Sequence, residues 1–303
     1  MQEGFHLSGL LSDRLETDLI RLAFQEDFGP LFSDPTTMLL CSDSSSYMRA
    51  HIVSKEVKPI IFCGQKVIDQ LIAQLALMLT NRQYPLSVIS HVHDGESVSQ
   101  GTTCATLHGS ALFILMLERT LLNFLQRLCA IATRTQQFVK RISHTKAIIL
   151  DTRKTSPGFR SFEKYAVRSG GGANHRMGLY DALMIKDTHT DQLGGMASVI
   201  SRLPLLTPNA LPVIVEVRSN EELDIVLKEG QGKVTRVLFD NLSISQLKEG
   251  VSRCYGVFQT EASGNVDLNR VASIAETGVD FISVGQLTHS AGSVDLSMWC
   301  ETQ

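Results

Sequence analysis

The stretch 151–189 holds the densest group of side chains that could bind an anion. Its cations surround a glycine turn at 170–172, although the whole chain carries a formal charge of −3. Arginine grips carboxylate or phosphate groups in a bidentate manner, and lysine supplies a compact positive charge. This density predicts a binding site for a polyanion. The cationic members are Arg153, Lys154, Arg160, Lys164, Arg168, His175, Arg176, Lys186 and His189.

The position of three of these cations distinguishes a binding site from a solvated helix face, which is the ordinary interpretation of a charge run. Arg153 and Lys154 come soon after the apolar run 147–150, and Lys186 directly follows the apolar run 182–185. Both groups therefore sit where a buried strand would end. A basic helix face does not explain that placement.

From residue 147 onward, apolar runs alternate with segments that have helix start and stop signals. One such signal is the pair Ser243 and Gln246, which fits a capping box. Continuous apolar strands alternating with helices predict a parallel sheet covered on its outer face. Because no GxGxxG motif follows the first strand, we expect an open barrel of about six β/α units instead of a dinucleotide-binding sheet.

In β/α barrels the chemistry collects at the carboxyl ends of the strands. The predicted strand ends combine cations for an anionic substrate with two carboxylates suited to sugar hydroxyls or a magnesium-bound diphosphate. They also carry small residues whose backbone amides can hold a phosphate. These residues are Arg153, Lys154, Lys186, Glu216, Asp240, Ser263, Gly264 and Gly285.

The N-terminal third has a different pattern, with short strands and amphipathic helices that predict an α+β sandwich domain. We expect this domain to span 1–110 and the barrel domain to span 111–289. A long helix over 111–142 would lead into the barrel, and the last segment, 290–303, would pack back on the first domain.

Arg119 is the unusual residue of the long predicted helix, since apolar residues flank it on both sides. A charge in that setting is costly unless it is paired or faces a wet site. It could pair with Glu118 or another acid, or it could face a ligand at a domain or subunit boundary. The sequence leaves both possibilities open.

Composition excludes several classes of protein. A pI near 6.3 argues against general nucleic-acid binding. The most apolar stretch, 111–132, is interrupted by Glu118, Arg119, Asn123, Gln126 and Arg127, which argues against a membrane span. Six scattered cysteines and an acidic N-terminus indicate reduced thiols in a cytoplasmic protein, without a disulfide framework or zinc site. His91 and His93 share a strand face but lack a third metal ligand.

Three segments, DTRKTSPGFR, EKYAVRSGGGANHRMGLYDALMIKDTH and LERTLLNFLQ, closely resemble quinolinate phosphoribosyltransferase, also called carboxylating nicotinate-nucleotide pyrophosphorylase. The resemblance extends over nearly the whole chain, through EDFGPLFSDPTT, VIVEVRS, VLFDN, EASG and GVDFISVGQLTHS. It implies a sandwich domain plus an open barrel, in homodimers whose active site is completed by the neighbouring subunit. The implied reaction transfers a phosphoribosyl group from phosphoribosyl pyrophosphate to quinolinate. Decarboxylation then yields nicotinate mononucleotide, pyrophosphate and CO₂, a step in de novo NAD biosynthesis.

The resemblance also implies a role for each strand-end residue. Quinolinate would be bound by Arg153, His175 and Arg176, with the catalytic lysines Lys154 and Lys186 between the two substrates. Glu216 and Asp240 would engage the ribose hydroxyls and Mg²⁺, the expected cofactor. The 5′-phosphate would lie against Ser263, Gly264, Asn265 and Gly285, and Arg119 would reach into the partner subunit's site.

Three features depart from the family pattern: Thr188 stands where Asn is usual, Asn265 where a second Gly is common, and the acidic loop 26–37 is a few residues longer. The changes at Thr188 and Asn265 leave open a catalytically inactive relative that binds a phosphoribosyl ligand. Two other enzymatic interpretations are a paralogue associated with molybdate transport, against which the NHR and IKD elements argue, and a Schiff-base aldolase that uses Lys186, against which the many arginines argue.

Overall fold

Six parallel strands form the sheet that carries most of the predicted site residues. In the computed structural model, which describes residues 2–41, 46–79 and 85–301, their order is β6-β11-β10-β9-β8-β7. This is the cyclic order of a barrel with one ladder missing, between β6 and β7, so the barrel is open. The strands are β6 (Ile148–Leu150), β7 (Leu183–Ile185), β8 (Val213–Val217), β9 (Arg236–Asp240), β10 (Gln259–Ser263) and β11 (Phe281–Ser283).

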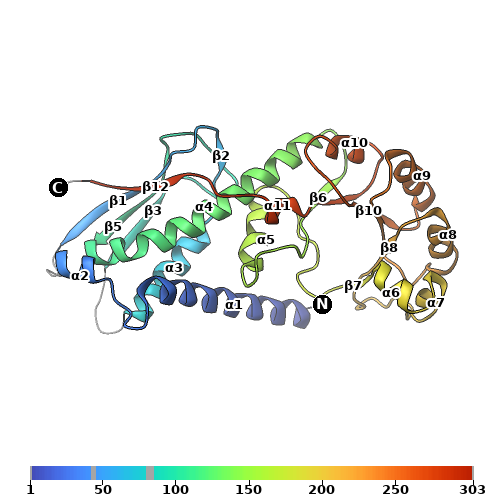
Figure 1. Cartoon of the computed structure of the whole chain (residues 1–303), viewed down its shortest axis with the longest axis horizontal. Helices are drawn as coiled ribbons and strands as arrows, with labels where there is room; N and C mark the ends of the chain where they lie inside the picture. The colour runs from blue at the N-terminus through green and yellow to red at the C-terminus, as the bar shows by residue number, and fades with distance from the viewer. Residues whose placement is uncertain (1, 42–45, 80–84, 302–303) are drawn as a thin grey trace. The chain divides into compact units, whose positions relative to one another are not determined.

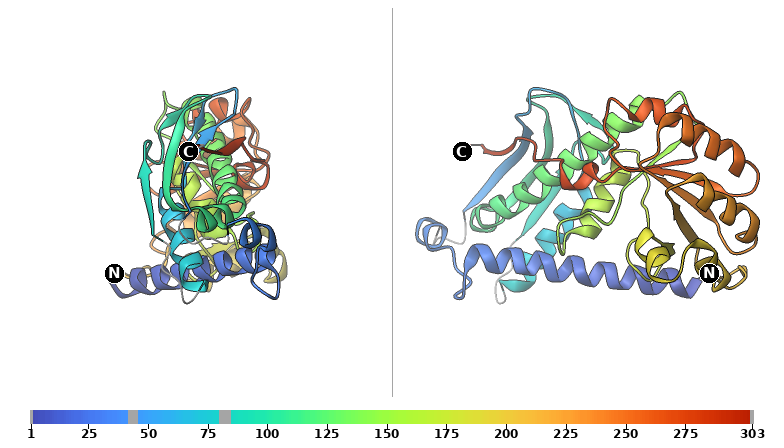
Figure 2. Two further views of the ribbon diagram at one scale, coloured as in Figure 1. Left: turned by 90° about the vertical axis from the view of Figure 1, so that its left-hand side faces the viewer. Right: turned by 45° about the vertical axis from the view of Figure 1, so that its right-hand side comes forward.

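Helices follow the barrel strands from β7 onward and cover the outer side of the sheet, as Figures 1 and 2 show for α8, α9 and α10. The helix starts agree with local chemistry: Ser219 caps α8, and Ser243 with Gln246 forms the expected capping box of α9. The helices after β7 are α6 (Asp187–Gln192), α7 (Met196–Ser201), α8 (Asn220–Glu229), α9 (Ile244–Cys254), α10 (Val271–Ala275) and α11 (Gln286–His289).

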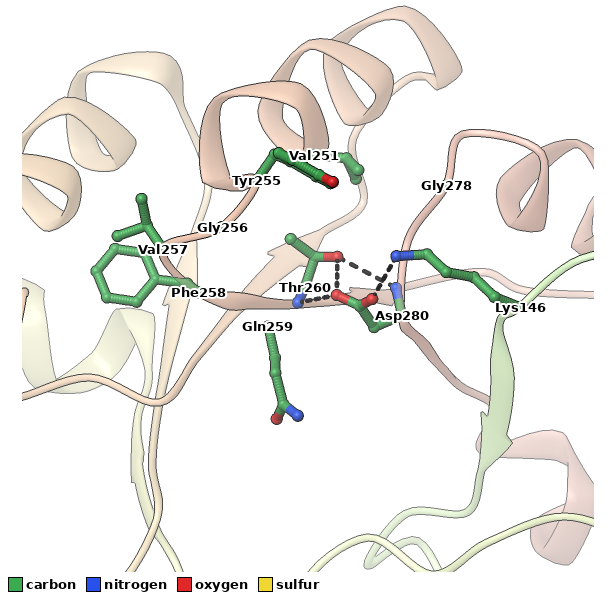
Figure 3. Close-up of a pocket in the computed structure, with 10 residues that line it drawn as sticks. All are labelled: Lys146, Val251, Tyr255, Gly256, Val257, Phe258, Gln259, Thr260, Gly278 and Asp280. Carbon is green, nitrogen blue, oxygen red and sulfur yellow. Dashed lines mark hydrogen bonds and ion pairs between the residues drawn. The ribbon is translucent and has the colours of Figure 1, made fainter.

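A cavity of about 370 Å³ lies at the amino ends of these strands, opposite the expected site (Figure 3). Its polar groups bind one another. Asp280 accepts hydrogen bonds from the backbone and hydroxyl of Thr260, both at 2.8 Å, and from Nζ of Lys146 at 2.6 Å. This carboxylate therefore ties together the starts of β6, β10 and β11.

We expect Asp280→Ala to lower the free energy of unfolding by about 1–3 kcal/mol, because buried donors lose their acceptor. Burial alone would raise the pKa of Asp280, but the hydrogen bonds from Lys146 and Thr260 lower it. The stabilisation should therefore be complete above the unfolded-state pKa of about 3.9 and disappear as the pH falls through the lower folded value. Urea unfolding at several pH values measures both effects. In the control variant Glu276→Gln, an exposed pair with His144 is lost, and the change should stay below about 0.5 kcal/mol.

The second compact unit, here the sheet unit, comprises residues 2–134, 156–171 and 291 onward; residues 135–155 and 172–290 form the barrel unit. The sheet unit holds an antiparallel sheet of order β12-β1-β5-β3 and a small β2-β4 pair. The final strand lies beside β1, with Ile52 opposite Met298 (Figure 1). The strands are β1 (Tyr47–Ser54), β2 (Ile60–Ile61), β3 (Leu86–Ser90), β4 (Ser97–Val98), β5 (Thr103–Ser110) and β12 (Leu296–Cys300).

Helices of the sheet unit bury apolar faces in its core. Val67, Leu71 and Leu75 of α3 recur at helical spacing and are fully buried. The rings of Phe124, Phe159 and Phe162 pack against one another with centroids 5.2–5.3 Å apart. The helices are α1 (Gln2–Phe28), α2 (Pro35–Leu40), α3 (Gln65–Met78), α4 (Ala111–Arg141) and α5 (Arg160–Ser169).

The unit boundaries differ from the expected division at 110/111. Most of α4 and all of α5 belong to the sheet unit. The reason lies in the Phe124 cluster and in a buried ion pair, 2.7 Å long, from Arg127 of α4 to Glu163 of α5. The fold class itself, an α+β domain with an open six-stranded β/α barrel, is confirmed. Among the described helices, none is long and apolar enough to cross a membrane.

Candidate active site

Asp151, directly after β6, fixes the loop that carries His175 and Arg176. Its side chain is fully buried and accepts hydrogen bonds from the backbone N–H of His175, at 2.9 Å, and from the side-chain amide of Asn174. Ala173 also pairs with Leu150 as an isolated parallel bridge. The loop that carries His175 and Arg176 therefore runs beside β6 and extends the barrel sheet by one bridge.

Arg176 and Arg153 form a pair of like charges at this edge of the barrel. Nη1 of Arg176 donates to the carbonyl of Ala182 at 3.0 Å. Burial lowers the pKa of the Arg176 guanidinium, the charge of Arg153 lowers it further, and Asp181 offsets this only in part. Two guanidinium groups that repel each other gain stability when an anion lies between them, so this pair favours a ligand with more than one negative charge.

Lys154 and Lys186 extend the positive region across the strand ends. The backbone carbonyl of Lys154 accepts a hydrogen bond from Thr288 at 2.8 Å, and a Cβ added at Gly285 would lie 3.1 Å from Cδ of Lys154. Glycine at 285 therefore leaves room for the lysine stem. The backbone N–H of Lys186 donates to Nδ1 of His189 at 2.9 Å, and its Nζ lies 3.9 Å from Oε2 of Glu216.

Glu216 of β8 and Asp240 of β9 are the two carboxylates of the site. Burial raises the pKa of Glu216; the charge of Lys186 opposes this effect, and the charge of Asp240 adds to it. A carboxylate whose ionisation is disfavoured by burial and by a neighbouring negative charge suits a cation. No group of three or more His, Cys, Asp or Glu residues that could hold a metal occurs in the described parts of the chain. Two carboxylates nevertheless fit Mg²⁺, which commonly takes its other ligands from water and substrate phosphates.

The loop after β10 is tied to Asp240 by two asparagines. Nδ2 of Asn265 donates to Oδ1 of Asn241 at 3.0 Å, and Nδ2 of Asn241 donates to Oδ2 of Asp240 at 2.9 Å. Asn241 and Asn265 have positive φ, as does Gly264 at +96°. A Cβ at Gly264 would overlap the Asn241 amide. The side chain of Asn265 is thus bound by Asn241, although the resemblance leads one to expect glycine at position 265.

Arg119 lies on α4 of the sheet unit, and the expected cost of burying its charge is absent. Its side chain is 61% exposed, with Nη2 3.9 Å from Oε1 of Glu118. Of the two possibilities that the sequence leaves open, the structure shows the pair with Glu118; the role at a subunit boundary stays a prediction. Arg160, Lys164 and Arg168 also belong to the sheet unit, through α5.

Comparison with known proteins identifies the family. The model of the quinolinate phosphoribosyl transferase C-terminal domain matches residues 131–299, and that of the N-terminal domain matches residues 34–129. The chain belongs to the quinolinate phosphoribosyltransferase family. The resemblance found in the sequence motifs is thereby confirmed.

Individual relatives of the quinolinate phosphoribosyltransferase family are similar along most of their length. A mitochondrial quinolinate phosphoribosyltransferase [decarboxylating] of Nicotiana tabacum is 38% identical, over 94% of this chain and 82% of the relative. A probable nicotinate-nucleotide pyrophosphorylase [carboxylating] of Bacillus subtilis is 36% identical, over 92% and 91%. The solved nicotinate-nucleotide pyrophosphorylase of Francisella tularensis has 36% identity and a TM-score of 0.83, over 95% and 96%.

Most of the residues predicted from sequence come together at the carboxyl ends of the barrel strands. Sequence reasoning gave no role to three residues that hold them: Asp151, Asn241 and Glu261. Glu261 lies in a strand whose residues 260–262 are buried, so its carboxylate must find partners inside the barrel, but the mixed polar sequence of that strand does not announce the burial. Asp151 directly follows the apolar run 147–150, which marks it as a strand end and no more, and the tie through Asn241 has no signal at the level of spacing.

Proposed function

We propose that this chain transfers a phosphoribosyl group from phosphoribosyl pyrophosphate to quinolinate and decarboxylates the product to nicotinate mononucleotide. The observation that carries the proposal is the group of cations at the carboxyl ends of the barrel strands, with Arg153 and Arg176 at the edge beside β6; burial lowers the pKa of Arg176, and the charge of Arg153 lowers it further. Quinolinate carries two carboxylates, so it supplies the charges that this pair lacks. Lys154 and Lys186, at neighbouring strand ends, then serve both anionic substrates.

The first chemical step forms the bond between ring nitrogen and sugar. Pyrophosphate leaves the anomeric carbon with the bonding electron pair, and the pyridine nitrogen of quinolinate donates its lone pair to that carbon. Fixed cations favour this step because they hold two polyanions together and need no reorganisation as charge moves. Arg153, Arg176 and Lys186 would orient the carboxylates and the diphosphate.

The second step uses the pyridinium that the first step makes. The carboxylate next to the ring nitrogen leaves as CO₂, and its electron pair remains on the ring carbon, where the positive nitrogen stabilises it. A proton then replaces the lost carboxylate. Lys154 would lie near this developing negative charge and is the candidate to stabilise it.

We also propose Mg²⁺ as a cofactor held by Glu216 and Asp240, partly through the substrate diphosphate. The position of the two carboxylates at neighbouring strand ends supports this, and the ion would supply positive charge to the leaving pyrophosphate. The same carboxylates would bind the ribose hydroxyls. Ser263, Gly264, Asn265 and Gly285 would hold the 5′-phosphate.

The direct test is an assay with quinolinate, phosphoribosyl pyrophosphate and Mg²⁺ that measures nicotinate mononucleotide and CO₂ together. We expect both in equal amounts. With nicotinate in place of quinolinate, turnover should be much lower, because one carboxylate is missing from a cationic pocket. Quinolinate binding without product would favour the inactive-relative interpretation, and no binding would overturn the proposal.

We propose a homodimer in which Arg119 completes the partner's site, which the exposure of its side chain supports. Arg119→Ala and Lys154→Ala should each be nearly inactive alone. Co-expressed chains should recover about a quarter of normal activity, since half the dimers are mixed and each of these has one intact site. Activity of separately purified dimers and the co-expressed mixture measures this.

The matched control mixes Lys154→Ala with Lys186→Ala. Both changes lie in the same chain's share of a site, so mixed dimers have no intact site and activity should not recover. Equal recovery in the two mixtures, or none in either, would contradict the cross-subunit role of Arg119.

We further propose that the protein acts in the cytoplasm. All six cysteines are free in the structure, as is usual for reducing compartments. Burial raises the pKa of the Cys104 and Cys254 thiols to about 11, which keeps them unreactive. Activity confined to an organelle fraction would contradict this location.

A further inference from the structure

Thr288 of α11 is a fully buried polar side chain of the barrel unit. Its hydroxyl lies 2.8 Å from the backbone carbonyl oxygen of Lys154 and 3.1 Å from that of Gly285. A hydroxyl has a single hydrogen to donate, and the shorter distance marks the carbonyl of Lys154 as the better acceptor. Thr288 therefore ties α11 to the loop that follows β6.

Lys154 is held on both sides of its Cα atom. Its backbone N–H donates to the hydroxyl of Thr152 at 3.0 Å, and its carbonyl accepts from Thr288. Because the peptide groups on both sides are fixed, the direction in which the side chain leaves the backbone is fixed as well. The lysine stem then passes Gly285, where an added Cβ would lie 3.1 Å from its Cδ.

The single turn of α11 is a firm base for these contacts. Leu287, the neighbour of Thr288, is fully buried, and the side-chain amide of Gln286 donates to the backbone carbonyl of Val266. A buried and anchored turn opens less readily than an exposed loop. Supports of this kind are what hold a functional side chain in a productive geometry.

We propose that Thr288 is a positioning residue for Lys154: its hydroxyl holds the lysine backbone so that the ammonium group lies where negative charge develops. The inference rests on the proposed function and deepens it, because it names what keeps the proposed catalytic lysine in place. Thr288 acts through Lys154 and not by touching a substrate.

An alternative role for Thr288 follows from its second acceptor. The bond to Gly285 lies within the turn of α11, and Gly285 is one of the residues proposed to hold the 5′-phosphate. If that bond were the important one, loss of the hydroxyl would raise the KM for phosphoribosyl pyrophosphate and leave kcat nearly unchanged. The positioning role predicts the opposite division between kcat and KM.

The kinetic test compares the wild type with Thr288→Val, which removes the hydroxyl and keeps the shape of the side chain. We expect kcat to fall about tenfold and both KM values to stay within about twofold, because misplacing a reacting group costs turnover more than binding. Thr288→Ser keeps the hydroxyl and should bring kcat to within about threefold of normal. A raised KM for phosphoribosyl pyrophosphate with normal kcat, or no rescue by serine, would overturn the proposal.

The matched control is Thr277→Val. Thr277 is also buried, and its hydroxyl donates to the carbonyl of Ile274 at 2.7 Å. This bond reaches three residues back, as the bond from Thr288 to Gly285 does, but it does not reach the site. Thr277→Val should lose stability in urea unfolding and keep kcat within about twofold. Equal falls of kcat in the two valine variants would show that the hydroxyl of Thr288 contributes only stability.

A double variant tests whether Thr288 acts through Lys154. In the Lys154→Ala background, Thr288→Val should change kcat by less than about twofold, since the group that it positions is gone. A further tenfold loss in this background would contradict the proposal.

Hydrogen–deuterium exchange of the segment 152–158 tests the hold on Lys154 without turnover. We expect exchange about tenfold faster in Thr288→Val than in Thr277→Val or the wild type. Thr288→Ala, which adds no bulk, replaces the valine variant if that one does not fold. If the wild type makes no nicotinate mononucleotide and exchange still differs, the function is wrong and the hold on Lys154 stands. If the wild type is active and exchange is unchanged, the function stands and the positioning role fails.

Discussion

Lys154→Ala should lower kcat by roughly 30- to 1,000-fold, the effect of losing about 2–4 kcal/mol of transition-state stabilisation when one fixed charge is removed. Lys154 follows β6 at the carboxyl end of the barrel, and the absence of a side chain at Gly285 leaves space beside its stem. The KM values should change less than kcat, because the charge acts mainly on the group that develops negative charge. Steady-state kinetics with both substrates measures the change.

Lys146→Ala is the control for that result. Lys146 precedes the same strand, but it lies at the amino end, where its Nζ binds Asp280 at 2.6 Å. Its loss should cost some stability and leave kcat within about twofold. If Lys154→Ala kept near-normal turnover while nicotinate mononucleotide still formed, the catalytic role of Lys154 would be wrong, although the reaction would stand.

The sequence predicts the barrel well because the signal for each strand end is local. An apolar run that stops at a charged or small residue, as at Glu216 and Asp240, marks a buried strand and the side chain that follows its carboxyl end. Predicting these positions requires no tertiary information beyond the rule that the carboxyl ends of parallel strands lie at the same edge of the sheet. The alternation of strands and helices then places them together, as the structure has them.

The sequence predicts less about what holds the site residues and where each compact unit ends. The contact from Glu261 to His175 joins residues far apart in the chain, and no periodicity marks it. The same is true of the ion pair between Arg127 and Glu163, which joins α4 and α5 within the sheet unit. For Arg119, the sequence leaves the direction of the side chain open. Its flanking residues in the sequence are apolar, yet its own side chain is on the exposed side of the helix.

Gly264→Ala should raise the KM for phosphoribosyl pyrophosphate at least about tenfold, because two costs combine at this residue. Its φ of +96° is one that side chains rarely adopt, and the added Cβ would overlap the amide of Asn241. Asn241 also binds Asp240 and Asn265. The substitution must therefore displace either the proposed phosphate loop or the carboxylate proposed to face the ribose. The strained backbone alone costs about 1–3 kcal/mol.

The matched control is Gly256→Ala, which separates backbone strain from the overlap. Gly256 also has positive φ, +73°, but nothing lies within 4 Å of the position of an added Cβ. Both variants should lose stability in urea unfolding, whereas only Gly264→Ala should bind phosphoribosyl pyrophosphate weakly. The KM for quinolinate should change little in either variant, since its proposed ligands lie near β6 and not on the loop after β10. A normal KM for phosphoribosyl pyrophosphate in Gly264→Ala would show that this loop does not hold the 5′-phosphate.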